Sequence, residues 1–556
     1  MTGVGTRETD ACVLVVGGGL VGLSLAVFLS WHRVPVVVVE RRSGALIHPR
    51  ARTINPRSVE LYRQVGLAGT ILDNRSFTDH SSSILFRAET LAGPERFRAP
   101  LDPPESIGDV SPCPWAPIDQ DKLEAILSAR AVQTGATVHF GTELRGFEQD
   151  DDGVDAVLLD RSTGAERTVR AEYLIAADGH RGRVREWLGI ATHGHGTIGH
   201  TMTLVFAADL TGPLRGRRLG VCHLDTPSPG TVLLSHDGDR RWVFSAPYHP
   251  DRGEALADFD ERRCVEMIRA AIGVPDLAVE IVPQLADGTT VLGYELAARV
   301  ADRFRQGRVF LAGDSAHVMP PTGAFGASTG IADAHNLAWK LAAVRNGWAG
   351  QGLLDSYDAE RRPVAELTVG QALLQLWKRT DPGSSGKAVF SPLDYYATVF
   401  GYRYDSTAVV VDAPSGSADA PSDSGEDVPA ALHPRKLTGQ PGTRAPHVVV
   451  RRVEDRGAEV STLDLFGRSF VLLAGPQAGA WFDAARSAGP AVSAHRLGTD
   501  LVDVEDRWPQ AHGVGAAGAV LVRPDGFVAW RAPGAPDGDA AGALAAVLDR
   551  LLDRRT

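Results

Sequence analysis

The chain has 556 residues, of which 44% are hydrophobic and 22% charged, and its formal net charge is −11. This length predicts two to four domains, and the acidic balance argues against nucleic acid or an anionic membrane as a partner. No apolar run is long enough to span a membrane, and residues 1–10 lack the apolar core of a secretory signal, so a cytoplasmic protein is expected. The four cysteines form no C-x-x-C pair and no metal-ligand spacing, which predicts neither a dithiol redox centre nor a metal site.

Residues 13–40 predict a strand, turn, helix and strand that together hold a dinucleotide. The apolar run Val13–Val16 is followed at once by Gly17-Gly18-Gly19-Leu20-Val21-Gly22, which is G-x-G-x-x-G in its required context. Gly17 permits the tight turn, Gly19 lets a pyrophosphate approach the backbone, and Gly22 lets the helix lie close to the strand. The phosphates then meet the helix N-terminus at Leu20 and Val21.

A second apolar strand, Val34–Val39, ends at Glu40, where a carboxylate can accept a hydrogen bond from a ribose hydroxyl. The segment that follows, residues 41–66, is rich in arginine. Some of these arginines, beginning with Arg41, could face phosphate or flavin, and solvated surface charge is the alternative. A glycine-rich turn in another kind of α/β protein is the alternative for the whole unit.

The next helix is expected from Ile118, with Asp119 as its N-cap and Gln120 in its first turn. Strands are then expected over 137–140, 144–148 and 154–159, the last two joined by a hairpin turn at residues 150–153. A further apolar strand, Tyr173–Ala177, stops at Asp178-Gly179. An acid at the carboxyl end of such a strand points into the ligand crevice.

Residues 201–282 change to alternating strands, which predicts a largely antiparallel β layer. Inward side chains of this layer could roof a substrate cavity, and core packing explains them equally well. The large ones, which we do not treat as site residues, are Phe206, His223, Trp242, Phe244 and Tyr248.

One more apolar strand, residues 308–312, ends in Gly313-Asp314. Residues 320–326 are expected to form a rigid loop, with Gly323 and Gly326 where the backbone passes close to a ligand. A helix is expected to open at Ser328-Thr329-Gly330, and its N-terminal end would stabilise negative charge on a bound ring.

These motifs together resemble the class A FAD-dependent monooxygenases of the p-hydroxybenzoate hydroxylase fold, and within them the actinomycete aromatic polyketide hydroxylases. Gly17–Gly22 with Glu40 is similar to the family's ADP-binding fingerprint, Asp178-Gly179 to its second motif and Gly313-Asp314 to its third. The resemblance implies that Asp314 binds the flavin ribitol.

The same resemblance implies further contacts with FAD. Gln120 and Arg50 would reach the flavin, Leu144 would contact adenine through its backbone, and residues 320–329 would lie under the isoalloxazine. The predicted cofactor site therefore consists of Gly17, Gly19, Leu20, Val21, Gly22, Glu40, Arg41, Arg50, Gln120, Leu144, Asp178, Asp314, Pro321, Gly323, Gly326, Ser328 and Thr329.

The implied fold is α/β: a Rossmann-like FAD-binding domain over 11–185 and 291–405, an antiparallel β substrate domain over 186–290, a linker over 406–442 and a thioredoxin-like domain over 443–556. The implied reaction reduces non-covalent FAD with NADPH or NADH, forms a flavin C4a-hydroperoxide with O2, and oxygenates an aromatic polyketide-type molecule. No side-chain nucleophile is required, and the protein would be a monomer or a homodimer.

The chain departs from the family pattern at Gly182, where serine is usual, and at Ser328, where asparagine is usual. His317 is expected to be a packed structural histidine. The last domain contains no cysteine, so we expect a structural or subunit-contact role, and truncation near Gly416 to leave NAD(P)H oxidation in any soluble product.

Other functions remain open. A non-catalytic flavoprotein sensor or scaffold, or another flavin oxidoreductase of the same fold, would carry the same motifs. A flavin halogenase would need a Trp-x-Trp signature, and a disulfide oxidoreductase would need a close cysteine pair; the sequence contains neither.

Overall fold

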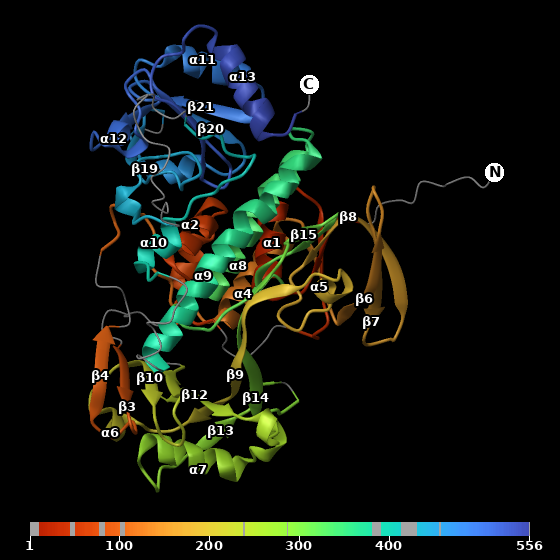
Figure 1. Ribbon diagram of the computed structural model, residues 1–556, viewed down its shortest axis with the longest axis vertical. Coiled ribbons are helices and arrows are strands. Elements are labelled where there is room, and N and C mark those ends of the chain that lie inside the picture. Colours follow the sequence, from red (N-terminus) through yellow and green to blue (C-terminus); the bar gives the residue numbers. More distant parts are fainter. Residues whose placement is uncertain are drawn as a thin grey trace, which may run out of the picture.

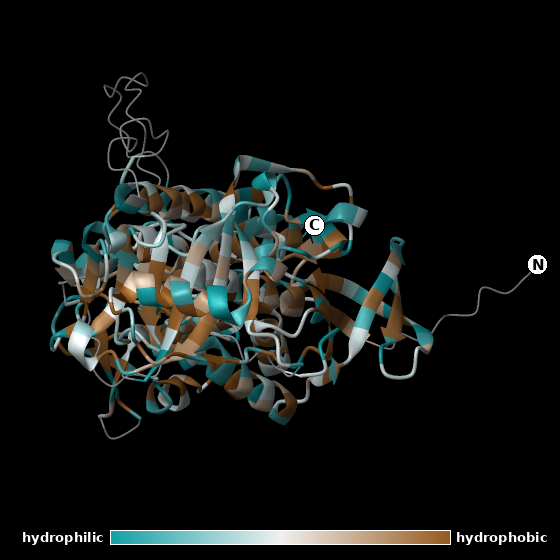
Figure 2. Ribbon diagram, turned by 90° about the horizontal axis from the view of Figure 1, so that it is seen from below, coloured by the Kyte–Doolittle hydropathy of each residue, from teal (hydrophilic) through white to brown (hydrophobic). Residues whose placement is uncertain are grey.

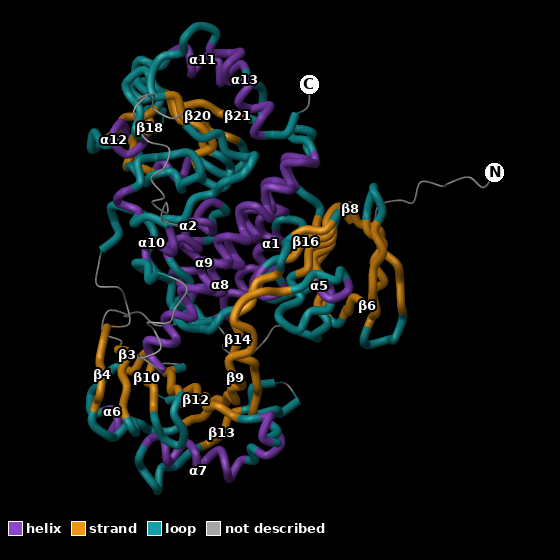
Figure 3. The backbone as a smooth tube through the Cα atoms, in the orientation of Figure 1, coloured by secondary structure: helices purple, strands orange, loops and turns teal. Residues whose placement is uncertain are grey.

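The computed structural model describes residues 11–44, 51–76, 84–100, 106–236, 240–285, 287–380, 391–412, 431–454 and 457–554. Figure 1 shows three bodies along the longest axis of the molecule: a sheet with one covering helix at the bottom, a sheet with long helices in the middle, and a separate body at the top formed by the end of the chain. Most helices gather in the middle body, and strands lie above them, below them and to one side (Figure 3).

The middle body contains the predicted dinucleotide unit. Its sheet has the order β15-β16-β8-β1-β2-β5, and the pairs between β16, β8, β1, β2 and β5 are parallel. β6 and β7 form the predicted antiparallel hairpin, which pairs onto β8. The strands are β1 (Ala11–Val16), β2 (Val36–Glu40), β5 (Thr137–Phe140), β6 (Thr142–Gln149), β7 (Val154–Asp160), β8 (Glu166–Ala176), β15 (Arg305–Gln306) and β16 (Val309–Leu311).

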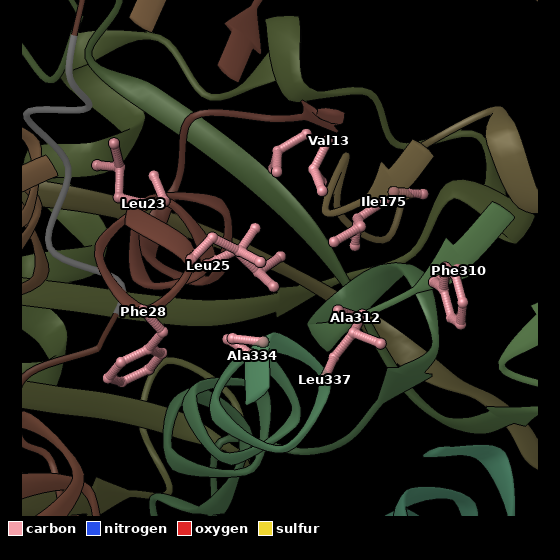
Figure 4. Close-up of a cluster of buried hydrophobic side chains, with 14 of the residues drawn as sticks. Val13, Leu23, Leu25, Phe28, Ile175, Phe310, Ala312, Ala334 and Leu337 are labelled. Atoms are coloured by element: carbon pink, nitrogen blue, oxygen red, sulfur yellow. The ribbon is translucent and has the colours of Figure 1, made fainter. Parts of the chain in front are cut away.

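Helices cover this sheet, which explains why every residue of β1 is buried and apolar. The core joins β1 and β8 to α1 and α8, as Val13, Ile175, Leu25 and Leu337 show in Figure 4. The helices of this body are α1 (Leu20–Trp31), α2 (Pro56–Gln64), α3 (Ala68–Asp73), α4 (Gln120–Gln133), α5 (Val184–Trp187), α8 (Phe325–Arg345), α9 (Ser356–Thr380) and α10 (Tyr395–Phe400).

The lower body confirms the predicted β layer, which is antiparallel except where β3 pairs with β10. The sheet has the order β17-β14-β9-β12-β11-β10-β3-β4, and β13 pairs with β9. Its strands are β3 (Ile84–Ala88), β4 (Glu95–Pro100), β9 (Thr192–Ala207), β10 (Leu219–Leu224), β11 (Thr231–Ser235), β12 (Arg241–Tyr248), β13 (Glu280–Val282), β14 (Val291–Ala301) and β17 (His317–Val318). A short helix, α6 (Thr211–Leu214), lies between β9 and β10 in the chain.

One face of this sheet packs against α7 (Glu261–Ile272), which lies beneath it in Figure 1. Phe206, Trp242 and Phe244 are buried in that core, so of the five large side chains these three do not line a cavity. His223 alternates with the core residue Cys222 along β10 and therefore lies on the opposite face, toward the middle body.

The upper body has the thioredoxin-like arrangement that the resemblance implied. β20 pairs in parallel with β21 and antiparallel with β23, in the order β21-β20-β23-β24. We call the part from β18 to α13 the C-terminal unit. Its elements are β18 (Val449–Arg452), β19 (Glu459–Ser461), β20 (Phe470–Ala474), α11 (Gly479–Ser487), β21 (Val492–Arg496), β22 (Leu501–Asp503), α12 (Trp508–His512), β23 (Ala519–Val522), β24 (Val528–Ala532) and α13 (Ala540–Leu551).

Figure 2 shows hydrophobic residues in brown and hydrophilic residues in teal, mixed across the elements of the molecule. In the part of the chain that the structure describes, no helix is long and apolar enough to cross a membrane.

Candidate functional site

The glycine turn after β1 is closed to side chains. Gly17 has φ 108°, and a Cβ there would lie 2.2 Å from the carbonyl oxygen of Ala177. A Cβ on Gly22 would lie 1.8 Å from the carbonyl oxygen of Gly17. Gly19 is the N-cap of α1 and has no side chain to cap it, so the N–H groups at Leu20 and Val21 stand at an open helix N-terminus. The turn is therefore shaped for an anion that approaches the backbone.

Glu40 ends β2 beside this turn and is 5% exposed. Its Oε2 accepts a hydrogen bond from the Gly18 N–H at 2.8 Å, and its Oε1 accepts from the backbone N and Nε of Arg42 at 2.9 and 2.8 Å. Burial by itself would raise the pKa of Glu40, but these hydrogen bonds and the charge of Arg42 hold the pKa below its usual value. The turn therefore has an ionised carboxylate beside it.

Arg42, the neighbour of the predicted residue Arg41, lies beside the glycine turn. Arg41 is exposed, whereas the Arg42 guanidinium lies 3.9 Å from the Cβ position of Gly19. Its Nη1 is buried without a hydrogen-bond partner among the described residues. The alternation of an extended chain, which puts residues 40 and 42 on one side, could have identified Arg42. Arg50, another predicted residue, lies outside the described residues.

Gln120 begins α4, as predicted, but its side chain is engaged within the protein. Its Oε1 accepts from the Ala51 N–H at 3.1 Å and its Nε2 donates to Glu124 at 2.7 Å. Asp119 is the N-cap residue, yet its carboxylate binds Arg52 at 2.9 Å instead of capping the helix, so that part of the expectation is wrong. The ion pair with Arg52 replaces a cap that the backbone N–H groups would otherwise receive.

Leu144 is buried in β6, where it pairs with Leu158 across the hairpin. The hairpin starts next to the glycine turn, because the Gly141 N–H donates to the Arg42 carbonyl oxygen at 2.8 Å. The structure thus brings the start of β6 to the same end of the sheet as Glu40.

Asp178 follows β8, and its carboxylate is nearly buried. Oδ2 accepts from the Val184 N–H at 3.2 Å, while Oδ1 has no partner among the residues described. Burial raises the pKa of Asp178 to about 6. A Cβ on Gly182 would lie 2.1 Å from the Asp178 carboxyl carbon, so a serine there would displace this carboxylate. The glycine at position 182, where serine is usual, therefore makes room for the Asp178 carboxylate.

Asp314 lies across a pocket from the second motif. The pocket has about 350 Å³ of empty volume, and its lining includes Gly179, Gly182, Asp314 and His317. The backbone around Asp314 is fixed, since the Gly313 N–H donates to Asp333 at 3.1 Å and the Ser315 hydroxyl donates to the Ala176 carbonyl oxygen at 2.6 Å. Asp314 itself is exposed and can meet a ligand.

The third motif also touches the first. Gly313 has φ 62°, and a Cβ there would lie 2.7 Å from the Val21 side chain. His317 is 2% exposed and binds Asp333 at 2.7 Å, in keeping with the structural role expected for it. The structure therefore gathers the three predicted motifs at one end of the sheet.

The helix after the third motif begins earlier than predicted. α8 starts at Phe325, because Gly323 and its N-cap Ala324 take left-handed backbone angles of φ 85° and 54°. Gly326 consequently lies inside the helix instead of in the loop, while Pro321 stays exposed before it. The unpaired N–H groups of the helix are those of its first turn, from Phe325 onward.

Ser328 and Thr329 point their hydroxyls into the protein. The Ser328 Oγ accepts from the Asn55 N–H at 3.3 Å, and the Thr329 Oγ1 donates to the Phe325 carbonyl oxygen at 2.9 Å. Both residues also line a second pocket, of about 320 Å³, together with Arg57 and Arg361. Only their backbones remain for a ligand at the start of α8.

Asp178→Asn is expected to change how the stability of the ligand-free protein depends on pH. The folded pKa of about 6 lies above the ordinary value of 3.8, so the contribution of Asp178 to stability is fully present below pH 4 and is lost as the pH rises through 6. Asparagine cannot ionise. The variant should therefore match the wild type near pH 4 and exceed it at pH 7 by about 1–3 kcal/mol.

Urea unfolding of both proteins at several pH values measures this difference. Because every other titrating group is shared, the difference between the two proteins isolates Asp178. A difference that stays constant from pH 4 to 7 would contradict the assigned pKa.

Known families and proteins match this chain over most of its length. The family model described as FAD binding domain matches residues 10–372, and the one described as aromatic-ring hydroxylase, C-terminal, matches residues 438–554. The chain is 44% identical to a putative polyketide hydroxylase of Streptomyces halstedii over 93% of each chain. It is 42% identical to aklavinone 12-hydroxylase RdmE of Streptomyces purpurascens over 99% of this chain and 100% of the relative.

Solved structures agree with this similarity. A ternary complex of aklavinone-11 hydroxylase with FAD and aklavinone superposes with a TM-score of 0.88 at 40% identity, over 99% of this chain and 100% of that one. The flavin-dependent monooxygenase PieE, in complex with FAD and substrate, superposes with a TM-score of 0.84 at 32% identity and the same coverage.

Proposed function

The chain belongs to the FAD-dependent aromatic-ring hydroxylases, and we propose that it uses NADPH or NADH and O2 to hydroxylate an aromatic polyketide. The observation that supports this most is the convergence of the glycine turn, Asp178 and Asp314 at one end of the sheet, beside a pocket that Gly179 and Asp314 line. Two relatives named putative polyketide hydroxylase match 93% and 96% of this chain, which supports the substrate class.

The residues present fit FAD. Gly19 leaves open space beside the turn, because a Cβ there would meet no atom closer than 3.7 Å, and the N-terminus of α1 favours a pyrophosphate in that space. The same region contains two buried polar atoms that have no partner among the described residues, Arg42 Nη1 and Asp178 Oδ1. A polar ligand would give both atoms a hydrogen-bond partner. Glu40 would accept from the ribose of the adenosine half, and the Asp314 carboxylate would accept from ribitol hydroxyls.

The remaining contacts follow from the positions of the other predicted residues. Gly17, Gly19, Leu20, Val21 and Gly22 would offer backbone to the pyrophosphate, and Leu144 would offer its backbone to adenine. Arg41, Arg50 and Gln120 would border the cofactor, and Pro321, Gly323, Gly326, Ser328 and Thr329 would support the isoalloxazine.

Bound FAD supplies the redox chemistry and the activation of oxygen. The protein would contribute charge and orientation, because the unpaired N–H groups at the start of α8 would stabilise negative charge on a flavin ring held there. We assign no side chain as a catalytic nucleophile. No cluster of metal-ligating residues occurs within the described ranges.

The substrate would lie between the start of α8 and the face of the lower sheet that α7 does not cover. On that face the Ser245 hydroxyl donates to the Thr203 hydroxyl at 3.0 Å, in the same row across the strands as His223. Burial, with the nearby charges of Arg379 and Arg87, lowers the pKa of His223 to about 4. A neutral imidazole there could exchange a hydrogen bond with a phenolic or carbonyl oxygen of the substrate.

The division into domains is part of the proposal. We divide the chain into an FAD-binding domain over 11–185 and 291–405, a substrate domain over 186–290, a linker over 406–442 and a C-terminal domain over 443–556. The active unit would be a cytoplasmic monomer or homodimer that needs no nucleic acid or membrane.

The test is a single set of stopped-flow experiments on the purified protein. The protein should be yellow with non-covalent FAD, be reduced by NADPH or NADH, and release hydrogen peroxide on reoxidation. Aklavinone and related hydroxylated anthraquinones should lower the peroxide released per NAD(P)H and yield products one oxygen heavier. Peroxide equal to the NAD(P)H consumed with every probe, and no oxygenated product, would favour the sensor or scaffold alternative.

A further inference from the structure

Four charged side chains that the proposed reaction does not use are completely buried where the C-terminal unit meets α8 and α9. Arg523 donates through Nη1 and Nη2 to the two carboxylate oxygens of Glu360 at 2.6 and 2.8 Å. It also donates to Asp525 at 3.0 and 2.5 Å. Lys340 donates to Glu360 at 2.7 Å, and all four side chains are at most 2% exposed. We call Lys340, Glu360, Arg523 and Asp525 the interface cluster.

Asn336, on α8, ties this cluster to the helix that begins at the proposed flavin site. Its amide nitrogen donates to Glu360 at 2.8 Å and to Asp525 at 3.1 Å, so one side chain of α8 binds both α9 and the C-terminal unit. Burial lowers the pKa of Lys340 to about 8 in spite of Glu360 beside it.

A second buried cluster continues the path to the flavin loops. Arg361, the residue after Glu360 on α9, donates to Asp333 at 2.8 Å and to the Thr329 carbonyl oxygen at 3.2 Å. Asp333 in turn accepts from the Gly313 N–H at 3.1 Å. This arginine therefore binds both the first turns of α8 and, through Asp333, the loop that carries Asp314.

Aromatic residues join the two clusters. Arg361 donates to the Tyr404 hydroxyl at 3.0 Å, and the Arg523 guanidinium lies 5.2 Å from the centre of the Tyr404 ring. Phe527, of the C-terminal unit, stacks on the same ring at 4.1 Å. From the other side, Arg57 of α2 donates to the Asp525 carbonyl oxygen at 2.9 Å.

We propose that the turn 523–527 of the C-terminal unit is a positioning element of the flavin site, in which Arg523 and Asp525 act through Asn336, Glu360 and Arg361 to hold the start of α8 and the Gly313-Asp314 loop. The physical reasons are the hydrogen bonds by which Arg523 links Glu360 of α9 to Asp525, and charge balance. Loss of Arg523 leaves Asp525 and part of Glu360 buried without a counter-charge, and the cluster must rearrange around Lys340 and Asn336. Because both lie on α8, the helix moves with them.

This inference rests on the proposed binding of FAD, and its test separates positioning from stability. The variants are Arg523→Met and Arg523→Lys, and the control is Leu473→Ala. Leu473 is fully buried in a core that consists only of residues from 445 onward, so its truncation destabilises the C-terminal unit without touching α8. FAD affinity and the visible circular dichroism of the bound flavin are measured well below the unfolding temperature of each protein.

Arg523→Met is expected to weaken FAD binding about 3- to 30-fold, which is the range that couplings through packed networks reach. It should also change the circular dichroism of the flavin. Arg523→Lys keeps the charge and should restore part of the affinity. Leu473→Ala should lower the unfolding temperature at wild-type FAD affinity. If Arg523→Met does not fold, Glu360→Gln with Arg523→Met removes one charge of each sign and leaves Lys340 and Asp525 balanced; it should fold and still bind FAD weakly.

Wild-type affinity in a folded Arg523 variant, or in the folded double variant, would overturn the positioning role. So would an equal loss of affinity in Leu473→Ala, because general destabilisation would then explain the effect. A wild-type protein that binds no FAD would instead overturn the proposed function.

Discussion

Gly22→Ala is expected to give protein that is mostly insoluble and that retains no FAD. The added methyl group would lie 1.8 Å from the carbonyl oxygen of Gly17, a distance that real Cβ atoms essentially never show. To make room, α1 must move away from β1, and both belong to the main core (Figure 4). Such overpacking of backbone against backbone exceeds the usual range of single substitutions, so we expect a loss of more than about 4 kcal/mol.

Soluble yield, FAD content and the urea midpoint of any soluble fraction measure this effect. Gly69→Ala is the matched control, because Gly69 lies in α3 and a Cβ there meets no atom within 4 Å. That variant should be neutral or up to about 1 kcal/mol more stable, since alanine favours a helix over glycine. A soluble Gly22→Ala protein with wild-type FAD content would contradict the geometry of the turn.

The turn that contains Gly22 is an example of a structure that the sequence alone predicts. The dinucleotide unit was predictable because its signals are local: an apolar strand, a glycine spacing and an acid at the end of the next strand all fall within residues 13–40. The hairpin over residues 142–160 and the antiparallel layer follow from local alternation in the same way.

The misplaced start of α8 has a different cause. Ala324 takes a left-handed conformation that alanine rarely adopts, so residue propensities do not predict a helix that begins at Phe325. The side chain of Asp119 was expected to cap a helix and instead binds Arg52, which is 67 residues away in the chain. Tertiary partners decide both cases, and a local pattern does not contain them.

The buried pairing of charged residues is the feature that the sequence predicts least. Glu360 and Arg523 are separated by 163 residues and carry no periodicity or motif that would pair them. Composition rules place such residues at the surface. The sequence therefore predicted a C-terminal domain without redox chemistry, while the way it contacts the rest of the chain became visible only in the folded structure.

That contact changes the expectation for a shortened protein. Ending the chain near Gly416 should yield a product that is insoluble or free of FAD, whereas the sequence alone suggested that NAD(P)H oxidation would survive. Lys340 and Glu360 would lose Arg523 and Asp525, and Glu60 would lose Arg444, which donates to it at 3.0 and 2.5 Å. Glu360 would keep Lys340 and Glu60 would keep Arg57, so each site loses only part of its pairing, at a cost below the roughly 3–5 kcal/mol of a fully unpaired buried charge.

Apolar surface would be lost as well. Trp339 of α8 is 2% exposed and meets the Phe470 ring edge-on at 5.8 Å, in a core that α8 shares with the C-terminal unit. Backbone pairs at the end of the chain add to this, since the Gly350 N–H donates to the Leu552 carbonyl oxygen at 2.8 Å. Because α8 begins at the proposed flavin site, exposing this side of the helix loosens the site itself.

The measurement compares the shortened protein with the same protein co-expressed with residues 417–556 as a separate chain. We expect the separate chain to dock and restore solubility, FAD content and reduction by NAD(P)H, because the interface is built from non-covalent contacts on both sides. Without the covalent link the two parts no longer share a high effective concentration, so docking requires that both chains are produced in large amounts. A contrary result would be a shortened protein that alone is soluble, holds FAD and is reduced at the full-length rate. It would show that α8 keeps its position without the C-terminal unit. The interface cluster would then contribute to stability only.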